Sequence, residues 1–186
     1  MKPKKNEKLI EEIEIPNGIF ARIENKDIII QKGSEESKRK INPKMNVKVE
    51  GNKIIISSDR ATRKEKKVFG STKAHIRNMI QGFGEKFRYK LQVASVHFPM
   101  TLTHDKSTNE LVVKNFLGEK KDRRIKLIPE VDVKINKDII EIESHDIEKA
   151  GQTASNIEKG TKVRKRDRRI FQDGIFIIEK PGRSYL

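Results

Sequence analysis

The chain has 186 residues, of which 42 are Lys or Arg and 27 are Asp or Glu, so its formal net charge is +15. This excess of positive charge implies a polyanionic partner, which could be RNA, DNA or an acidic membrane. Cysteine is absent, which excludes disulfides, thiolate zinc sites and cysteine nucleophiles. No apolar run approaches the roughly 20 residues that span a bilayer, and no signal-type stretch opens the chain. We therefore expect a soluble, cytoplasmic protein without a membrane segment.

Short apolar runs separated by turn residues occupy the first third of the chain. The runs at 13–15, 19–23 and 28–30 predict an antiparallel meander rather than helices. In residues 45–58, apolar and polar residues first alternate, a Gly-Asn turn follows, and a run of β-branched residues comes after the turn. This pattern predicts a hairpin.

The periodicity changes after this hairpin. Thr62 and Glu65 have the spacing of a capping box, in which each residue bonds to the backbone of the other at the start of a helix. Apolar residues then follow at helical intervals, which predicts one amphipathic helix: Phe69, Ile76, Ile80, Phe83 and Phe87.

The second half repeats this order of elements. Strands are predicted at 89–98, 100–103, 111–113, 125–128, 131–135 and 139–142. A second helix follows, capped by Ser144 or Asp146. One face of it carries Ile147, Ala150, Gly151, Ala154 and Ile157.

Residue matches support an internal duplication, although chance could also produce them. Residues 47–49 resemble 133–135, and Gly70 and Gly151 begin the same Gly-x-Thr-x-x-x-Ile pattern in the two helices. A helical Gly costs about 1 kcal/mol relative to Ala, so we expect both glycines to permit close approach of helix to sheet. The predicted fold is α+β, with tandem homologous domains at 1–84 and 85–186, each an antiparallel β-sheet packed by one α-helix.

The sequence offers no catalytic or metal-binding pattern. The four histidines are scattered without metal-ligand spacing. The glycines at 82–84 and 33 lack the Gly-Lys-Ser/Thr continuation of a phosphate-binding loop. No carboxylate pair lies among apolar residues that would raise a pKa for acid catalysis. We expect a protein that is not an enzyme and that needs no cofactor or metal.

Three basic runs carry more information. Residues 60–67 and 120–126 hold five Lys or Arg each, and residues 162–169 hold six with a single Asp167. A basic run is often only a solvated surface, but three of them on a chain of this charge favour phosphate contacts. Arginine dominates the last run, and its planar guanidinium pairs with two phosphate oxygens at once. Because aromatic residues are few, recognition of folded RNA by shape and backbone is expected rather than single-strand reading.

The residues after the third run resemble a family signature. The segment Arg169-Ile170-Phe171-Gln172-Asp173-Gly174-Ile175-Phe176, preceded by Val163-x-x-Arg166-x-x-Arg169, resembles the C-terminal signature of the ribosomal protein L6 family. The resemblance is to its archaeal and eukaryotic branch, called L9 in eukaryotes. Both helices and the Ile15-Pro16 pair are also similar to the family. One departure is Lys159, where that branch usually has Gln.

The resemblance implies a non-catalytic protein of the large ribosomal subunit. The family binds large-subunit ribosomal RNA by the sarcin-ricin loop and the stalk base, where translation factors dock. The expected partners are therefore this RNA and the neighbouring ribosomal proteins, with translation factors nearby and no membrane. The expected location is the cytoplasm, on the ribosome.

Our hypothesis places RNA contacts in the second domain. Gly151 and Gln152 would let a helix N-terminus approach the RNA backbone, and the Asp173-Gly174 turn would orient the tail. Six side chains would neutralise phosphates: Lys162, Arg164, Lys165, Arg166, Arg168 and Arg169. We expect residues 2–8 and 181–186 to be disordered in the free protein.

Two rival functions remain open at this point. The first is a free-standing nucleic-acid-binding module or RNA chaperone, which would use the same basic surface outside a ribosome. The second is an RNA-processing or RNA-modifying enzyme, for which the sequence supplies no nucleophile, metal set or cofactor loop.

Overall fold

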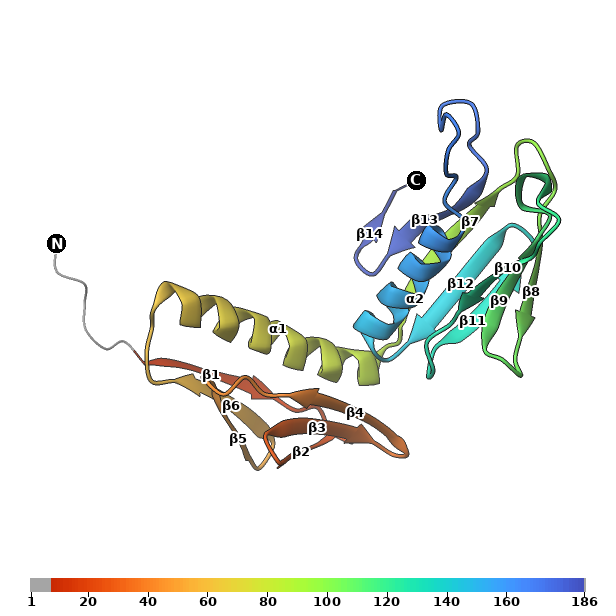
Figure 1. The fold of residues 1–186 in the computed structure, drawn as a ribbon. Coiled ribbons are helices and arrows are strands. Elements are labelled where there is room, and N and C mark those ends of the chain that lie inside the picture. The colour runs from red at the N-terminus through yellow and green to blue at the C-terminus, as the bar shows by residue number, and fades with distance from the viewer. Residues whose placement is uncertain (1–7, 186) are drawn as a thin grey trace, which may run out of the picture. The chain divides into compact units, whose positions relative to one another are not determined.

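A computed structural model describes residues 8–185 of the chain, which divides into two compact units between Glu85 and Lys86 (Figure 1). Each unit is built from antiparallel strands and one long helix. The predicted α+β class is confirmed, and each unit adds a second, three-stranded sheet to the predicted arrangement. The expectation for residues 2–7 lies outside the described residues.

The first unit holds two three-stranded sheets. The order of one is β1-β6-β5 and that of the other is β2-β3-β4, with antiparallel pairing throughout. The elements are β1 (Leu9–Glu14), β2 (Phe20–Glu24), β3 (Asp27–Lys32), β4 (Glu35–Lys40), β5 (Asn46–Glu50), β6 (Lys53–Ser58) and α1 (Arg63–Gly84).

The predicted capping box begins α1. The backbone N–H of Glu65 donates to Thr62 Oγ1 at 3.3 Å, and Glu65 Oε2 accepts from the Thr62 N–H at 3.1 Å. The hydrogen bond from the Thr62 side chain also holds the pKa of Glu65 below its ordinary value. Apolar positions at helical spacing then point into the core of the unit, where Ile76, Ile80 and Phe83 are buried.

The second unit has a five-stranded sheet of order β11-β12-β7-β13-β14 and a three-stranded sheet of order β10-β9-β8. The first half of its elements are β7 (Phe87–Ala94), β8 (Thr101–Asp105), β9 (Glu110–Lys114), the 3-10 helix η1 (Phe116–Gly118) and β10 (Arg123–Lys126). The others are β11 (Asp132–Asn136), β12 (Ile139–Ser144), α2 (Ile147–Gly160), β13 (Gly174–Lys180) and β14 (Arg183–Ser184).

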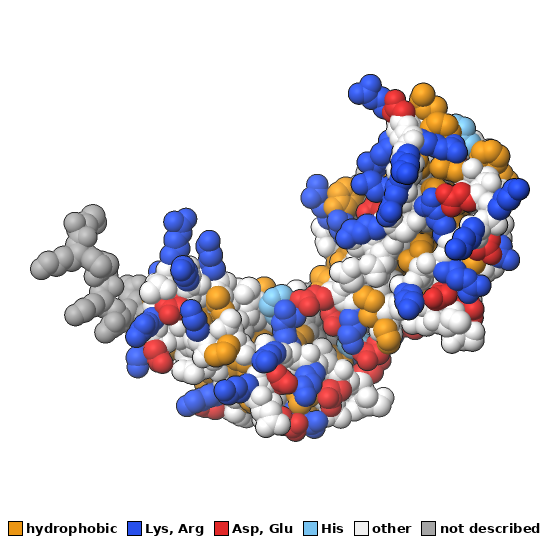
Figure 2. All heavy atoms as spheres, in the orientation of Figure 1, with side chains coloured by type: hydrophobic (Ala, Val, Ile, Leu, Met, Phe, Trp, Pro, Cys, Tyr) orange, Lys and Arg blue, Asp and Glu red, His pale blue; other side chains and the backbone are white. Residues whose placement is uncertain are grey.

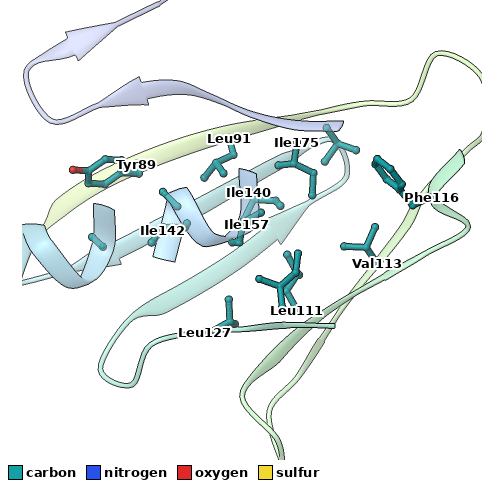
Figure 3. Close-up of a cluster of buried hydrophobic side chains, with 14 of the residues drawn as sticks. Tyr89, Leu91, Leu111, Val113, Phe116, Leu127, Ile140, Ile142, Ile157 and Ile175 are labelled. Carbon is teal, nitrogen blue, oxygen red and sulfur yellow. The ribbon is translucent and has the colours of Figure 1, made fainter. Parts of the chain in front are cut away.

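The core of this unit lies between the five-stranded sheet, α2 and the smaller sheet. Apolar side chains from these elements point toward one another in Figure 3. Strand β7 lies at the centre of the five-stranded sheet, between β12 and β13. Its residues alternate: Phe87, Tyr89, Leu91 and Val93 are buried, and the residues between them are more exposed. Helix α2 contributes Ile157, which is fully buried. Removing such apolar surface from water stabilises the fold by roughly 25 cal/mol per Å².

Some boundaries differ from the prediction. The helical pattern was extended to Phe87, but Glu85 adopts extended backbone angles and ends α1, so Phe87 begins β7 instead. Residues 181–186 were expected to be disordered, which is wrong for the described part: Arg183–Ser184 pair with β13, and the Tyr185 N–H donates to the Ile178 carbonyl at 2.8 Å.

The two matched helical glycines have different surroundings. A Cβ on Gly151 would lie 2.8 Å from Tyr89 Oη on β7, so the predicted close approach is confirmed there. A Cβ on Gly70 would meet nothing within 4 Å, so the same prediction for α1 is wrong. The sequence match at this position therefore does not reflect a shared packing requirement.

Candidate nucleic-acid interface

The third basic run lies in the segment that joins α2 to β13. We call residues 161–173 the basic loop; they contain neither helix nor strand. In Figure 1 this blue segment projects beyond the start of β13, and Figure 2 shows Lys and Arg side chains gathered over it.

The start of the basic loop is attached to the core. The Thr161 hydroxyl donates to the Ile157 carbonyl at 3.1 Å and accepts from the Ile175 N–H at 3.0 Å, so it ties the end of α2 to β13. Two residues later the side chain of Val163 is buried in the core of the unit. These contacts fix the point from which the basic residues leave.

The other end of the basic loop is attached through Asp173, whose side chain is 1% exposed. Its carboxylate accepts from the His97 backbone N–H at 2.9 Å and lies 2.6 Å from His97 Nδ1. Burial acts to raise the pKa of Asp173, but the hydrogen bonds from His97 outweigh it and hold the pKa below its ordinary value. Because an ionised carboxylate only accepts hydrogen bonds, Nδ1 must carry the proton.

Ring contacts and a turn order the middle of the basic loop. The Phe171 ring stacks on His97 with centroids 5.0 Å apart, and the Arg166 guanidinium lies 4.8 Å from the centroid of the Phe171 ring. Asp167 Oδ1 accepts from the Arg169 N–H at 2.9 Å, and the Asp167 carbonyl accepts from the Phe171 N–H at the same distance. Asp167 is thus used to shape the turn.

The six predicted basic side chains all lie on this loop and are all exposed. None of them forms a salt bridge with any residue that the structure describes. Uncompensated positive charge held on a short anchored segment is suited to neutralising phosphates. These residues are Lys162, Arg164, Lys165, Arg166, Arg168 and Arg169.

The second basic run is used differently, because internal contacts engage its arginines. Arg123 forms two hydrogen bonds with Glu119, donates to the Gly160 carbonyl at 2.9 Å and lies 3.9 Å from the centroid of the Phe116 ring. The hydrogen bonds from Arg123 hold the pKa of Glu119 below its ordinary value. Arg124 pairs with Glu110 at 3.5 Å.

The first basic run surrounds the beginning of α1 in the other unit. Its five Lys and Arg side chains are exposed. It therefore forms a basic surface on the first unit.

Gly151 and Gln152 lie in α2, away from its first turn. The N-terminus of α2 is capped by Asp146, whose Oδ1 accepts from the Glu148 N–H at 2.8 Å and from the Lys149 N–H at 3.4 Å. Two carboxylates, those of Asp146 and Glu148, therefore already occupy the positive end of the helix. Gln152 donates to Asn156 Oδ1 at 2.8 Å and is exposed.

The sequence reasoning missed the pair formed by His97 and Asp173, which are 76 positions apart. The Asp-Gly turn was expected to orient the tail, but nothing indicated its partner. Among residues 8–185, no group of three or more His, Asp or Glu residues could hold a metal ion. In that same part of the chain no helix is long and apolar enough to cross a membrane.

Comparison with known proteins supports a ribosomal assignment. Two segments, residues 15–86 and 107–174, match the family described as Ribosomal protein L6. The chain is 39% identical over 174 residues to the large ribosomal subunit protein uL6 of Methanococcus vannielii, covering 93% of this chain and 94% of that protein. It is 41% identical to uL6 of Sulfurisphaera tokodaii, with 92% of each covered, and 37% identical to uL6 of Methanobrevibacter smithii, with 91% and 95% covered.

These relatives are structural proteins of the ribosome and not enzymes. Two matched segments fit two α+β units, and the three relatives share the archaeal character that the C-terminal signature indicated. The chain belongs to the ribosomal protein L6 family.

Proposed function

We propose that the chain is a structural constituent of the large ribosomal subunit that binds large-subunit ribosomal RNA through the basic loop. The observation that carries this proposal is the set of six exposed Lys and Arg side chains that form no salt bridge among the described residues. Both ends of the loop are fixed by buried residues. Less conformational entropy is therefore lost when the loop binds a rigid RNA surface.

The location within the subunit is the finer part of the proposal. Following the family resemblance, we place the contact by the sarcin-ricin loop, the stalk base and the factor-binding region, with neighbouring ribosomal proteins as further partners. The chain would shape this RNA in the cytoplasmic ribosome and support translation without catalysis.

Gly151 and Gln152 would make a secondary contact. Since Asp146 already caps α2, a phosphate at the helix end would meet a carboxylate. The contact would instead be made by the exposed surface around Gln152. Lys159 is also exposed, near the other end of the same helix, and would add positive charge to this surface.

Sucrose-gradient fractionation of source-cell lysate in moderate salt tests the proposal. Mass spectrometry of each fraction should recover the chain with the large subunit at a ratio of one copy to one. Recovery only in the fractions without ribosomes would contradict the proposal and support the rival free-standing nucleic-acid-binding module.

A further inference from the structure

A groove of about 510 Å³ lies between the last turn of α2, the basic loop and the start of β13. Ligand sites in proteins commonly have volumes of roughly 300 to 1,000 Å³, so the groove is large enough for one nucleotide. Its lining is chemically mixed. It includes three cations, Lys159, Lys162 and Arg168, oxygen-bearing side chains such as those of Glu158 and Gln172, and the ring of Phe176.

The cationic part of the groove suits a phosphate. Lys162 and Arg168 are both exposed and have no salt-bridge partner among the described residues. They come from separate parts of the basic loop, yet both line the groove. A phosphate placed there would have charge-assisted hydrogen bonds available from two side chains.

The apolar part of the groove offers an aromatic surface. Phe176 is 38% exposed, so its large apolar side chain is accessible from solvent. Its ring is positioned by Gly174, because a Cβ there would lie 3.0 Å from Phe176 Cζ and 3.2 Å from Cε2. The ring therefore lies directly against the glycine backbone. Exposed aromatic rings in RNA-binding proteins stack on unpaired bases.

The polar part of the groove presents hydrogen-bond acceptors. Glu158 Oε1 accepts from the Ile177 N–H at 3.4 Å, which leaves Oε2 without a partner among the described residues. Gln172 Nε2 donates to the Arg169 carbonyl at 3.1 Å, so its Oε1 remains available. Acceptors select for N–H donors, and a carboxylate can accept from both the N1–H and the N2 amino group of guanine.

We propose that this groove binds one unpaired nucleotide of ribosomal RNA and prefers guanine. Lys162 and Arg168 bind its phosphate, Phe176 stacks on the base, and Glu158 accepts from its Watson–Crick edge. The inference deepens the proposed function and rests on it, since the basic loop must first bring the RNA to the groove. It adds base selection to a surface that would otherwise recognise only backbone.

The test compares full-length protein binding to RNA hairpins that differ at one position. The stem is either fully paired or carries one bulged G, A, C or U, and affinities are measured by fluorescence anisotropy in moderate salt. One good bidentate base contact gives about tenfold discrimination or more. We therefore expect the bulged-G hairpin to bind about tenfold more tightly than the paired one, and more tightly than the other bulges.

Glu158→Gln is the sharpest variant. The amide oxygen can still accept from the Ile177 N–H, which directs the NH₂ group toward the base, where it meets the N–H donors of guanine. The preference for bulged G over the paired hairpin should fall to about threefold or less. Glu141→Gln removes the same charge from β12, outside the groove, and should leave the preference unchanged.

Phe176→Leu keeps an apolar side chain while removing the aromatic ring. It should weaken binding to every bulged hairpin and leave binding to the paired hairpin unchanged. Circular dichroism of each variant checks that the fold is retained.

The outcomes separate the two proposals. If the wild type binds paired and bulged hairpins equally well, the groove proposal is wrong while RNA binding stands. The same conclusion follows if Glu158→Gln changes all affinities by one common factor. If the protein binds none of these RNAs, both proposals fail.

Discussion

The basic loop and the segment 119–126 have similar Lys and Arg content, but the structure uses them in opposite ways. In 119–126 the arginines are engaged by Glu119, Glu110 and the Gly160 carbonyl, so they hold the second unit together. In the basic loop the only acid within the basic run, Asp167, shapes a turn, and the surrounding cations form no salt bridge among the described residues. A basic run indicates an RNA-binding surface only when the rest of the chain leaves its charges free.

The largest effect is expected from removing three of these uncompensated charges. Replacing Arg164, Arg166 and Arg168 together by Ala should lower RNA affinity by about 100-fold near physiological salt. The slope of log K against log salt should fall by roughly 0.7 to 0.9 for each phosphate that is no longer neutralised. The measurement is a salt titration of RNA binding by fluorescence anisotropy.

Three ion-paired basic residues of the first unit provide a control with the same change of net charge. Arg22, Lys38 and Lys53 pair with Glu36, Asp27 and Glu12. Replacing these three by Ala should change the slope much less. An equal change for both triple variants would show that net charge, and not the basic loop, determines binding.

In contrast to the triple variant of the basic loop, Arg123→Ala should lower the stability of the protein and change its RNA affinity little. The variant removes the bonds to Glu119 and Gly160 and the packing of the guanidinium on Phe116. Partial exposure of the pair reduces the cost through solvent screening, so we expect about 1 to 2 kcal/mol in the free energy of unfolding. Urea denaturation measures it.

Lys120→Ala is the control within the same segment. Its side chain is exposed, so the change in stability should stay within about 0.5 kcal/mol. If Arg123→Ala lowers RNA affinity as strongly as the triple variant of the basic loop, the contrast between the two segments is wrong.

Asp173→Asn tests whether the anchor of the basic loop matters. The amide keeps one acceptor for the His97 backbone N–H, but its NH₂ group replaces the carboxylate oxygen that accepts from Nδ1. We expect a loss of about 1 kcal/mol in the free energy of unfolding. RNA affinity should fall less than in the triple variant, because the six charges remain.

The pH dependence gives this variant a second readout. The pKa of Asp173 in the folded protein lies below its unfolded value of about 3.8. The stability that the ionised carboxylate contributes is therefore fully present above about pH 3.8. It is lost as the pH falls through the folded pKa. The wild type should therefore lose stability below about pH 4 more steeply than Asp173→Asn. Parallel stability curves for the two proteins would contradict this role.

The sequence was informative where a signal is local. The capping box of α1, the alternation of β7 and the tandem α+β plan follow from residues close together in the chain. The six basic residues also lie in one short segment. Their exposure was therefore predictable from composition alone, while the absence of salt bridges to the described residues was not, because it depends on how distant strands pack.

The features that were missed depend on distant contacts or weak local patterns. Strand β4 contains no large apolar residue, since it is a charged edge strand, so periodicity could not reveal it. Strand β13 was treated as part of a tail, although it pairs with β7 in the centre of the unit. The run 175–178 of apolar residues was the signal that could have identified it.

The two matched glycines extend the same contrast to uncharged residues, and their substitutions should change the stability in opposite directions. Gly70→Ala adds a methyl group to open space in α1 and should stabilise the protein by about 1 kcal/mol through helix propensity. Gly151→Ala gains the same propensity, but its methyl group meets the Tyr89 hydroxyl at 2.8 Å. Overpacking of this kind costs about 1 to 3 kcal/mol, so the net effect should be destabilising. Urea denaturation of both variants measures the difference, and equal stabilisation would show that Tyr89 moves aside freely.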